Sequence, residues 1–403
     1  MIEFDRALRI VLSSELPPMG AEIVPVIAAL GRVVKGDVGS TEDVPAFDNS
    51  AMDGFAVRSE DIRNVPAKLR VVLDLPAGSV ASRPLALGEA ARIMTGAPIP
   101  PGADTVVRVE DTEEAEGTVT VLKHVEAGRN IRHRGEDVRR GSTAIRNGTV
   151  LRAQEIGVLG SIGRVSVVVA QRPRVAILST GDELVECHEP VGPGQVRNSN
   201  SLTLASLVRM YGGEPILLGI ARDNLADLRE RLAVGLAADM LVTTGGVSVG
   251  KYDLVKDVLG EAGLELRFWR VAMRPGMPTA FGLVRGKPVF ALPGNPVAVV
   301  VTFYQFVRPA LLQMMGARCL RKPVVRAVLH SPVEKAGGRL HFVSAYAWAE
   351  DSGFHVEVRG SQGAGILSSL TLANSLILVP PDSSGYRTGD TVTVQLLDAS
   401  EVE

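Results

Sequence analysis

Three observations on the sequence predict a multidomain α/β protein. Strand-like and helical segments alternate between residues 174 and 315, as in the βαβ units of a parallel sheet covered by helices on both faces. Short β-branched runs and turns fill residues 44–150, which indicates a mostly β domain inserted into a helical and irregular scaffold. After residue 321 every segment is a short strand, which predicts a C-terminal β barrel or sandwich of about 80 residues.

The N-terminal half is expected to open with a helix. Apolar residues recur at helical spacing between residues 5 and 16, and Pro17-Pro18 ends the pattern. The inserted domain is then expected to contain strands at 51–58, 69–75, 105–109 and 118–122, separated by turns such as 98–102.

The α/β region and the tail complete the predicted elements. Strands of the sheet are expected at 174–179, 216–220, 240–244 and 288–292. Helices are expected at 201–211, 224–236, 253–262 and from Pro296 onward. Strands of the tail are expected at 324–329, 342–348, 356–358, 376–379 and 391–396.

Charge and cysteine content narrow the class of function. The 403 residues include 43 Lys and Arg against 45 Asp and Glu, which argues against a protein that coats nucleic acid or an anionic membrane. The sequence has no uninterrupted run of about 18 apolar residues, so no membrane span is predicted. Two cysteines, Cys187 and Cys319, are too few for a disulfide framework and fit a reduced, cytoplasmic compartment. Small molecules and copies of the chain are the expected partners.

Three unusual loops follow predicted strands of the same sheet. They are 179–183 (STGDE), 243–250 (TTGGVSVG) and 292–296 (LPGNP). Ligands of open α/β sheets bind at the carboxyl ends of the strands, so these loops are expected to converge on one binding site.

The second loop has four interpretations. Residues 245–251 match the front of a phosphate-binding P-loop, but Tyr252 stands where Ser or Thr should bind Mg²⁺. Residues 246–250 match the nucleophile elbow G-x-S-x-G, but the downstream histidines fall in the β-rich tail. A tight turn that needs glycine is a third interpretation. The fourth is an anion cradle made of backbone N–H groups at a helix start.

Three carboxylates are expected near the same edge of the sheet: Glu183, Asp223 and Asp253. They would repel one another without a cation, and Mg²⁺ suits an all-oxygen site beside phosphates. Structural roles also fit, because Asp223 could cap the following helix and Asp253 could begin its own. Cys187 lies close to Glu183, and a small buried apolar role is the favoured interpretation for it.

A second polar patch lies in the N-terminal half, at 45–57 (PAFDNSAMDGFAV), 92–98 (RIMTGAP) and 132–138 (RHRGEDV). An ordinary Asx turn could explain its first part. Physical reasoning alone does not bring this patch to the α/β edge.

These strings together resemble the molybdopterin molybdenumtransferase family, which includes MoeA and the gephyrin E domain. The resemblance covers essentially the whole chain, and 275–278 (PGMP) adds to it. It implies a four-part subunit with a three-layer αβα domain and a C-terminal β barrel. The implied boundaries are 1–44 plus 138–173 for the scaffold, 45–137 for the insertion, 174–318 for the α/β domain and 319–403 for the barrel. It also implies a homodimer in which the inserted domain of one subunit faces the α/β domain of the other.

The resemblance implies a reaction and a set of site residues. Molybdate would join the dithiolene of adenylylated molybdopterin, with Mg²⁺-dependent release of AMP, in the cytoplasm and beside other proteins of molybdenum cofactor biosynthesis. The implied catalytic residues are Asp53, Thr95, Asp137, Glu183, Asp223 and Asp253, of which Glu183, Asp223 and Asp253 would bind the metal. The implied binding residues are Gly245, Gly246, Ser248, Arg274, Pro293, Gly294, Asn295, Pro296, Arg339 and Ser368.

The chain departs from the family patterns around the oxyanion. Residues 274–278 read RPGMP where many members have KPGKP, so Arg274 keeps a charge and Met277 loses one. In the tail pattern G-R-x-E-F-x-R, only Arg339 remains of the charged residues. Lys251, where members often have Asp, could restore the charge lost at Met277 or be an ordinary solvated lysine.

Two other functions stay open on the sequence alone. One is a non-catalytic scaffold of the gephyrin kind, for which no additional partner-binding segment is visible. The other is a paralogue that handles another oxyanion, such as tungstate.

Overall fold

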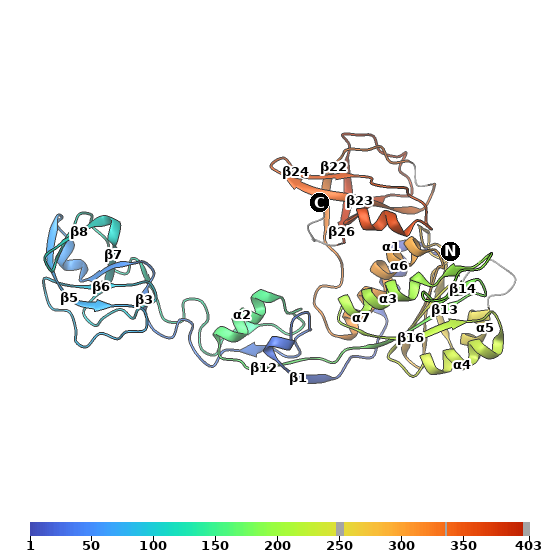
Figure 1. Ribbon diagram of the computed structural model, residues 1–403, viewed down its shortest axis with the longest axis horizontal. Coiled ribbons are helices and arrows are strands. Elements are labelled where there is room, and N and C mark those ends of the chain that lie inside the picture. The colour runs from blue at the N-terminus through green and yellow to red at the C-terminus, as the bar shows by residue number, and fades with distance from the viewer. Residues whose placement is uncertain (247–253, 335–336, 398–403) are drawn as a thin grey trace.

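Three six-stranded sheets form most of the architecture in residues 1–246, 254–334 and 337–397, which a computed structural model describes. The molecule is elongated, with the inserted β domain at one end and the α/β domain and barrel at the other (Figure 1). The scaffold lies between these two ends. This arrangement confirms the predicted fold class and separates the two polar patches of the sequence within one subunit.

The scaffold is built from short paired segments. β1 (Ala21–Pro25) pairs antiparallel with β12 (Ser166–Ala170). The expected N-terminal helix is present as α1 (Phe4–Ser13), and its buried face joins the core of the α/β domain. The remaining scaffold elements are η1 (Val26–Ala28), β2 (Val38–Gly39), β11 (Thr143–Ile145) and α2 (Ala153–Ser161).

The inserted domain is a sheet in the order β7-β4-β6-β5-β9-β8. Its main strands are β4 (Gly54–Val57), β5 (Ala67–Leu75), β6 (Glu89–Ile93), β7 (Thr105–Arg108), β8 (Thr112–Ala115) and β9 (Thr118–Val121). The short elements are β3 (Asn49–Ser50), η2 (Ser59–Ile62), η3 (Val109–Asp111) and β10 (Ile131–Arg132). Aliphatic clusters cover both faces of the sheet, as alternation of side chains along a strand requires.

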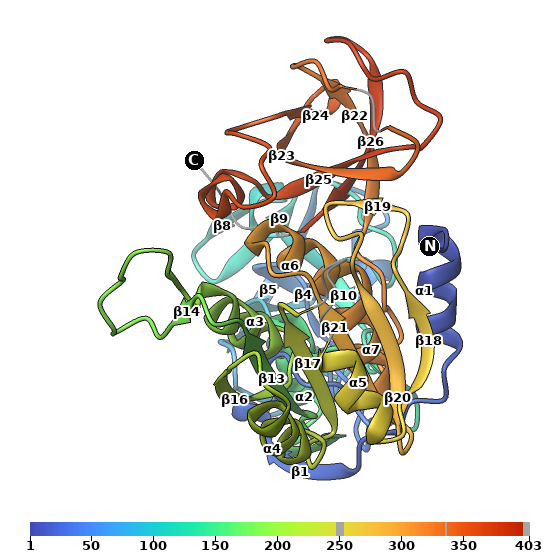
Figure 2. The ribbon, with the colours of Figure 1, turned by 90° about the vertical axis from the view of Figure 1, so that its right-hand side faces the viewer.

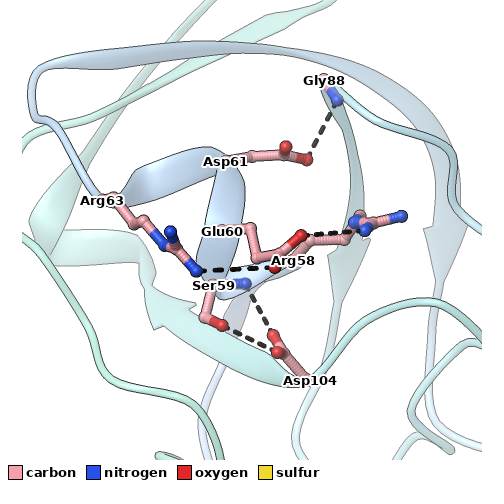
Figure 3. Close-up of polar contacts among 7 residues, drawn as sticks. All are labelled: Arg58, Ser59, Glu60, Asp61, Arg63, Gly88 and Asp104. Carbon is pink, nitrogen blue, oxygen red and sulfur yellow. Dashed lines mark hydrogen bonds and ion pairs between the residues drawn. The ribbon is translucent and has the colours of Figure 1, made fainter.

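Polar contacts fasten η2 to the rest of this sheet (Figure 3). The carboxylate of Asp104 accepts hydrogen bonds from the backbone N–H of Ser59 at 2.6 Å and from its hydroxyl at 2.7 Å. Asp61 accepts from the N–H of Gly88 at 3.0 Å. The bond from the Ser59 N–H satisfies a backbone donor at the start of the 3₁₀ turn, and the bond from Gly88 ties the turn to the segment before β6.

A two-strand neck joins the insertion to the scaffold (Figure 1). Val44 and Val138 pair there as an isolated antiparallel bridge, so the chain enters and leaves the insertion at the same place. Asp43 accepts hydrogen bonds from Arg134 Nε and from the backbone N–H of Arg140, both at 2.7 Å. These two hydrogen bonds lower the pKa of the Asp43 carboxyl.

The α/β domain has the strand order β16-β13-β17-β21-β20-β18. Its strands are β13 (Arg174–Thr180), β16 (Glu214–Ala221), β17 (Met240–Thr244), β18 (Glu265–Trp269), β20 (Ala280–Val284) and β21 (Lys287–Leu292). β13, β16, β17 and β21 are parallel, as predicted. β20 and β18 are antiparallel additions that the alternation did not indicate.

Helices cover both faces of this sheet and make it three-layered. Val175 and Ile177 of β13 share a core with α1, α3 (Ser199–Met210), α6 (Pro296–Thr302) and α7 (Arg308–Met314). Ala176 and Leu178 face the other way, toward α4 (Leu225–Gly235) and α5 (Leu254–Glu261). Two short strands, β14 (Leu184–Val185) and β15 (Val196–Arg197), pair outside the main sheet.

A π-helical segment, η4 (Phe303–Val307), joins α6 to α7 into one continuous helical stretch. Residues Pro296–Met314 are long and apolar enough to cross a membrane by length and composition, but 94% of the apolar window is buried inside the protein. The stretch is therefore the central core helix of the domain.

The C-terminal sheet runs β19-β23-β24-β22-β26-β25, and a further β23–β25 pairing closes five strands into a barrel. Its strands are β22 (Val324–Leu329), β23 (Leu340–Glu350), β24 (Gly353–Glu357), β25 (Ser375–Val379) and β26 (Thr391–Leu396), with the turn η5 (Leu367–Leu372). β19 (Met273–Arg274) comes from the α/β domain and pairs with β23. Figure 2 shows the barrel above the α/β sheet with β19 between them.

Candidate functional site

The carboxyl ends of four parallel strands form one edge of the α/β sheet. β13 ends at Thr180 and is paired with both β16 and β17, and β17 is paired with β21. The segments that follow these strands therefore emerge side by side at 181–183, 222–223, 245–246 and 293–295. This is the convergence that the strand alternation predicts, at the position where open α/β sheets bind ligands.

The loop after β17 requires glycine for two physical reasons. Gly245 and Gly246 have φ of +88° and +68°, a region that L side chains rarely occupy. A Cβ on Gly245 would lie 2.4 Å from the carbonyl oxygen of Thr180, and one on Gly246 would lie 2.8 Å from the Thr180 hydroxyl. That hydroxyl is buried and has no partner among the described residues. Ser248 and Lys251 lie outside the described residues.

Asn200, in the first turn of α3, connects two of these loops. Its Nδ2 donates to Thr244 Oγ1 at 3.1 Å and to the carbonyl oxygen of Gly294 at 2.7 Å. Thr244 Oγ1 in turn donates to the carbonyl oxygen of Pro293 at 2.8 Å. Asn200 is not among the residues predicted from the sequence, where the polar run 198–201 at a helix start was the available signal.

Acidic side chains gather at the β13 and β16 ends. Partial desolvation raises the pKa of the Asp223 carboxyl, and the nearby charges of Asp182 and Glu183 raise it further. Asp223 is not the helix cap that one interpretation suggested, because Asn224 caps α4 by accepting from the N–H of Asp227 at 2.9 Å. The backbone N–H of Asp223 instead donates to Asp182 Oδ1 at 3.2 Å.

No three acidic, histidine or cysteine side chains enclose a possible metal position among the residues that the structure describes. Asp253, the third predicted metal ligand, lies outside them. The oxygen donors of Glu183 and Asp223 nevertheless suit Mg²⁺, which commonly takes one or two carboxylates and completes its shell with water and substrate phosphate. Desolvation is the main cause of the raised pKa of Asp223, and the charges of Asp182 and Glu183 contribute to it.

A pocket of about 320 Å³ adjoins the 293–295 loop, where the α/β domain meets the barrel. Its lining includes the predicted residues Arg274, Pro293, Asn295 and Arg339. Pro296 opens α6, and the side chain of Asn295 makes no cap hydrogen bond there. Ser368 is exposed outside the lining, whereas its neighbour Ser369 is buried and lines the pocket.

Two guanidinium groups give this pocket a positive charge. Arg274 and Arg339 are its charged lining residues, and no acidic side chain of the described chain lines it. The Nη1 of Arg339 contacts Met277 Sδ at 3.3 Å, at the position where the family pattern has a lysine. The sequence analysis did not assign His341, which also lines the pocket.

The inserted domain brings Asp53 and Thr95 into contact, whereas Asp137 lies at its neck. The backbone N–H and the hydroxyl of Thr95 both donate to Asp53 Oδ1 at 2.7 Å. These bonds lower the pKa of the Asp53 carboxyl. Asp137 lies at the neck, where its N–H donates to the carbonyl of Val44 at 3.0 Å. Figure 1 shows the inserted domain at the opposite end of the molecule from the α/β domain.

The prediction that Cys187 is a small buried residue is wrong. Cys187 is exposed, because it follows β14 in a turn-rich segment outside the main sheet. Cys319 is exposed as well.

Comparison with known protein families gives matches along most of the chain. Three family models match successive parts of the chain: the MoeA N-terminal region (domains I and II) at 2–163, a probable molybdopterin binding domain at 176–313, and the MoeA C-terminal region (domain IV) at 326–397.

Relatives match over most of their length. The molybdopterin molybdenumtransferase of Nostoc sp. is 39% identical over 93% of this chain and 88% of its own. The Haemophilus influenzae protein of the same name is 35% identical over 98% of both chains. The crystal structure of a molybdopterin biosynthesis moeA protein from Pyrococcus horikoshii OT3 superposes with a TM-score of 0.84 at 34% identity, covering 98% of this chain and all of the other.

Proposed function

This chain belongs to the molybdopterin molybdenumtransferase family, and from that membership we propose how its two sites divide the work. It is a transferase of molybdenum cofactor biosynthesis. We propose that the glycine-lined carboxyl edge binds adenylylated molybdopterin and that the adjoining cationic pocket binds molybdate. The 293–295 segment carries this proposal, because it follows the end of β21 and its residues Pro293 and Asn295 also line the cationic pocket.

The carboxyl edge suits a phosphate-bearing substrate. Glycine at 245 and 246 puts no side chain over this loop. The N–H of Gly245 donates to the carbonyl oxygen of Leu292 at 3.2 Å, so the N–H of Gly246 is the donor that we assign to a phosphate. Backbone N–H groups in such loops bind phosphate without a lysine. Asn200 would keep the 244–245 and 293–294 segments at a fixed separation. The substrate phosphate and the oxyanion would then be bound in a fixed position relative to each other.

Glu183 and Asp223 would hold Mg²⁺ beside the substrate phosphates, with Asp253 as a third candidate. Bound there, Mg²⁺ would neutralise charge on the phosphates during hydrolysis of the adenylate. Glu183 would also position the attacking water, and AMP would leave as the product of that hydrolysis. Lys251 remains a candidate for additional charge at the oxyanion.

We also propose that the active unit is a homodimer with a composite site. Apolar side chains on the scaffold are strongly exposed, including Ile27 at 88%, Val165 at 85% and Ile23 at 72%. Exposed apolar clusters of this kind are typical of subunit interfaces. A symmetric partner would bring its Asp53 and Thr95 to this subunit's α/β edge, which one subunit cannot do alone.

We propose a cytoplasmic location and further protein partners on the same assignment. Neither free cysteine is in a disulfide, which suits the cytoplasm. Other proteins of molybdenum cofactor biosynthesis would deliver the substrate and receive the product.

The direct test mixes purified protein with adenylylated molybdopterin, Mg²⁺ and either molybdate or tungstate, and measures AMP and active cofactor. AMP release with molybdate is expected. Absence of turnover with both oxyanions would favour the scaffold function, and turnover with tungstate alone would favour the paralogue.

Subunit complementation tests the composite site. Asp53→Ala and Glu183→Ala proteins are each expected to be inactive and folded. When they are co-expressed at equal amounts, half the dimers should be mixed, and each mixed dimer should contain one intact site. About a quarter of wild-type activity is therefore expected. A mixture without activity would show that both residues act within one subunit, or that one of them is not where we place it.

A further inference from the structure

His341 is a polar group of the cationic pocket that the proposed function leaves without a role. It lies at the start of β23 and lines the pocket together with Arg274 and Arg339. Its Nδ1 is buried and has no hydrogen-bond partner among the described residues. Buried polar atoms in folded proteins are usually paired, so an unpaired one in a pocket calls for an explanation.

The surroundings of His341 keep its ring uncharged. Burial is the main cause that lowers its pKa to about 4, and the charges of Arg274 and Arg339 lower it further. Arg274 is its direct neighbour across the β19–β23 pairing. The other packed segments, the start of α6 and residues 362–364, bring no charged side chain to the pocket.

The neutral ring matters because the two guanidinium groups have no competing anion. Neither Arg274 nor Arg339 forms an ion pair with a residue that the structure describes, and residue 277, which contacts Arg339, is an uncharged methionine. The described lining therefore has a net charge of two positive units. A carboxylate at position 341 would face both guanidinium groups and halve that net charge.

We propose that His341 is a specificity-determining residue of this pocket, where an uncharged imidazole leaves both guanidinium charges to a tetrahedral dianion. The inference rests on the proposed function of the pocket as the oxyanion site. Methionine at position 277 removes a cation from the pocket, but position 341 holds no acid that would offset the charges of Arg274 and Arg339. These two guanidinium groups are therefore sufficient to bind a dianion.

An acid at position 341 should weaken the binding of two ions of the same shape by different amounts when their charges differ. Coulomb energy is proportional to ligand charge, so a carboxylate at position 341 should penalise a dianion twice as much, in the logarithm of affinity, as a monoanion. A purely steric effect would penalise both ions equally. Molybdate and perrhenate are tetrahedral oxyanions with charges of two and one.

The experiment measures both affinities by calorimetry for the full-length wild type, His341→Glu and the uncharged control His341→Gln. His341→Glu should bind molybdate about 10- to 100-fold more weakly and perrhenate only about 3- to 10-fold more weakly. His341→Gln should stay within about threefold of wild type for both ions. If His341→Glu is poorly folded by thermal unfolding, His341→Asp carries the same charge on a shorter side chain and should show the same ratio.

Three outcomes would overturn the inference: unchanged molybdate affinity in the acidic variants, an equal loss for both ions, or no binding of either ion by the wild type. AMP release by the same wild-type preparation separates this failure from failure of the proposed function. Turnover with unchanged molybdate affinity in His341→Glu would reject only the role of His341.

Discussion

Replacement of Gly245 by alanine is the sharpest test of the glycine-lined edge. The added Cβ would lie 2.4 Å from the Thr180 carbonyl oxygen, so the β17 loop must retreat by roughly 1 Å. Alanine at φ +88° costs about 1–2 kcal/mol. Relief of the steric overlap adds about 1–3 kcal/mol. The free energy of unfolding should therefore fall by about 2–5 kcal/mol.

Thermal unfolding and AMP release measure the two consequences. The unfolding midpoint should fall by roughly 5–15 °C, and displacement of the loop by about 1 Å should lower turnover by about 100-fold. Gly260→Ala is the matched control, because Gly260 lies on an exposed position of α5 and a Cβ there would meet nothing within 4 Å. That control should keep full activity and gain up to about 1 kcal/mol. A Gly245→Ala protein with wild-type midpoint and turnover would refute the close-approach argument.

Three further predictions address other parts of the chain. Asn200→Ala removes both loop-connecting hydrogen bonds, so turnover measured by AMP release should fall at least about 10-fold. Circular dichroism should show little loss of secondary structure. Wild-type turnover would count against the positioning role of Asn200. Thr95→Val removes one of two hydrogen bonds to Asp53 while keeping the shape of the side chain, so it should reduce turnover less than Asp53→Ala does, and the reverse order would contradict this. The ion pair with Arg83 lowers the pKa of the Glu89 carboxyl to about 2, so its contribution to stability should be complete above about pH 5 and vanish toward pH 2. Glu89→Gln should therefore lower the unfolding midpoint at pH 7 and make that midpoint less dependent on acid. Identical pH profiles of the variant and the wild type would contradict this prediction.

The parallel core of the α/β domain was predictable because its signals are local. The apolar runs at 174–180 and 240–244 each end in a threonine that is followed by glycine, and Pro296 marks a helix start. These patterns depend on burial and on backbone preferences of neighbouring residues. They were sufficient to place four strand ends, and with them the loops at 181–183, 245–246 and 293–295, on one edge.

Other features depend on local signals that were weak. Arg285 and Gly286 have φ of +51° and +78° and form the two-residue turn between β20 and β21. Arginine is an uncommon residue in such a turn, so the hairpin and its antiparallel strands were missed. Helix α2 has nine residues and contains two glycines, Gly157 and Gly160, which mask its helical pattern.

Parts of the site itself were not predictable because they depend on contacts between distant residues. Asn200 meets Gly294 across 94 residues of sequence, and His341 meets Arg274 through pairing of β19 with β23. No periodicity within either segment encodes these contacts. The family patterns pointed to Arg274 and Arg339, whereas the pairing of β19 with β23 puts His341 beside Arg274 in the lining of the same pocket.

The bridge between Val44 and Val138 holds the two ends of the inserted segment side by side. Because both ends of the inserted segment meet at one point, a short turn could close the gap in its place without stretching the scaffold. Closing a chain across nearby ends adds little entropy cost, since that cost grows only with the logarithm of loop length. The scaffold pairing of β1 with β12 lies outside the excised segment and would be retained. The described pairing of the scaffold therefore uses no residue of the inserted segment.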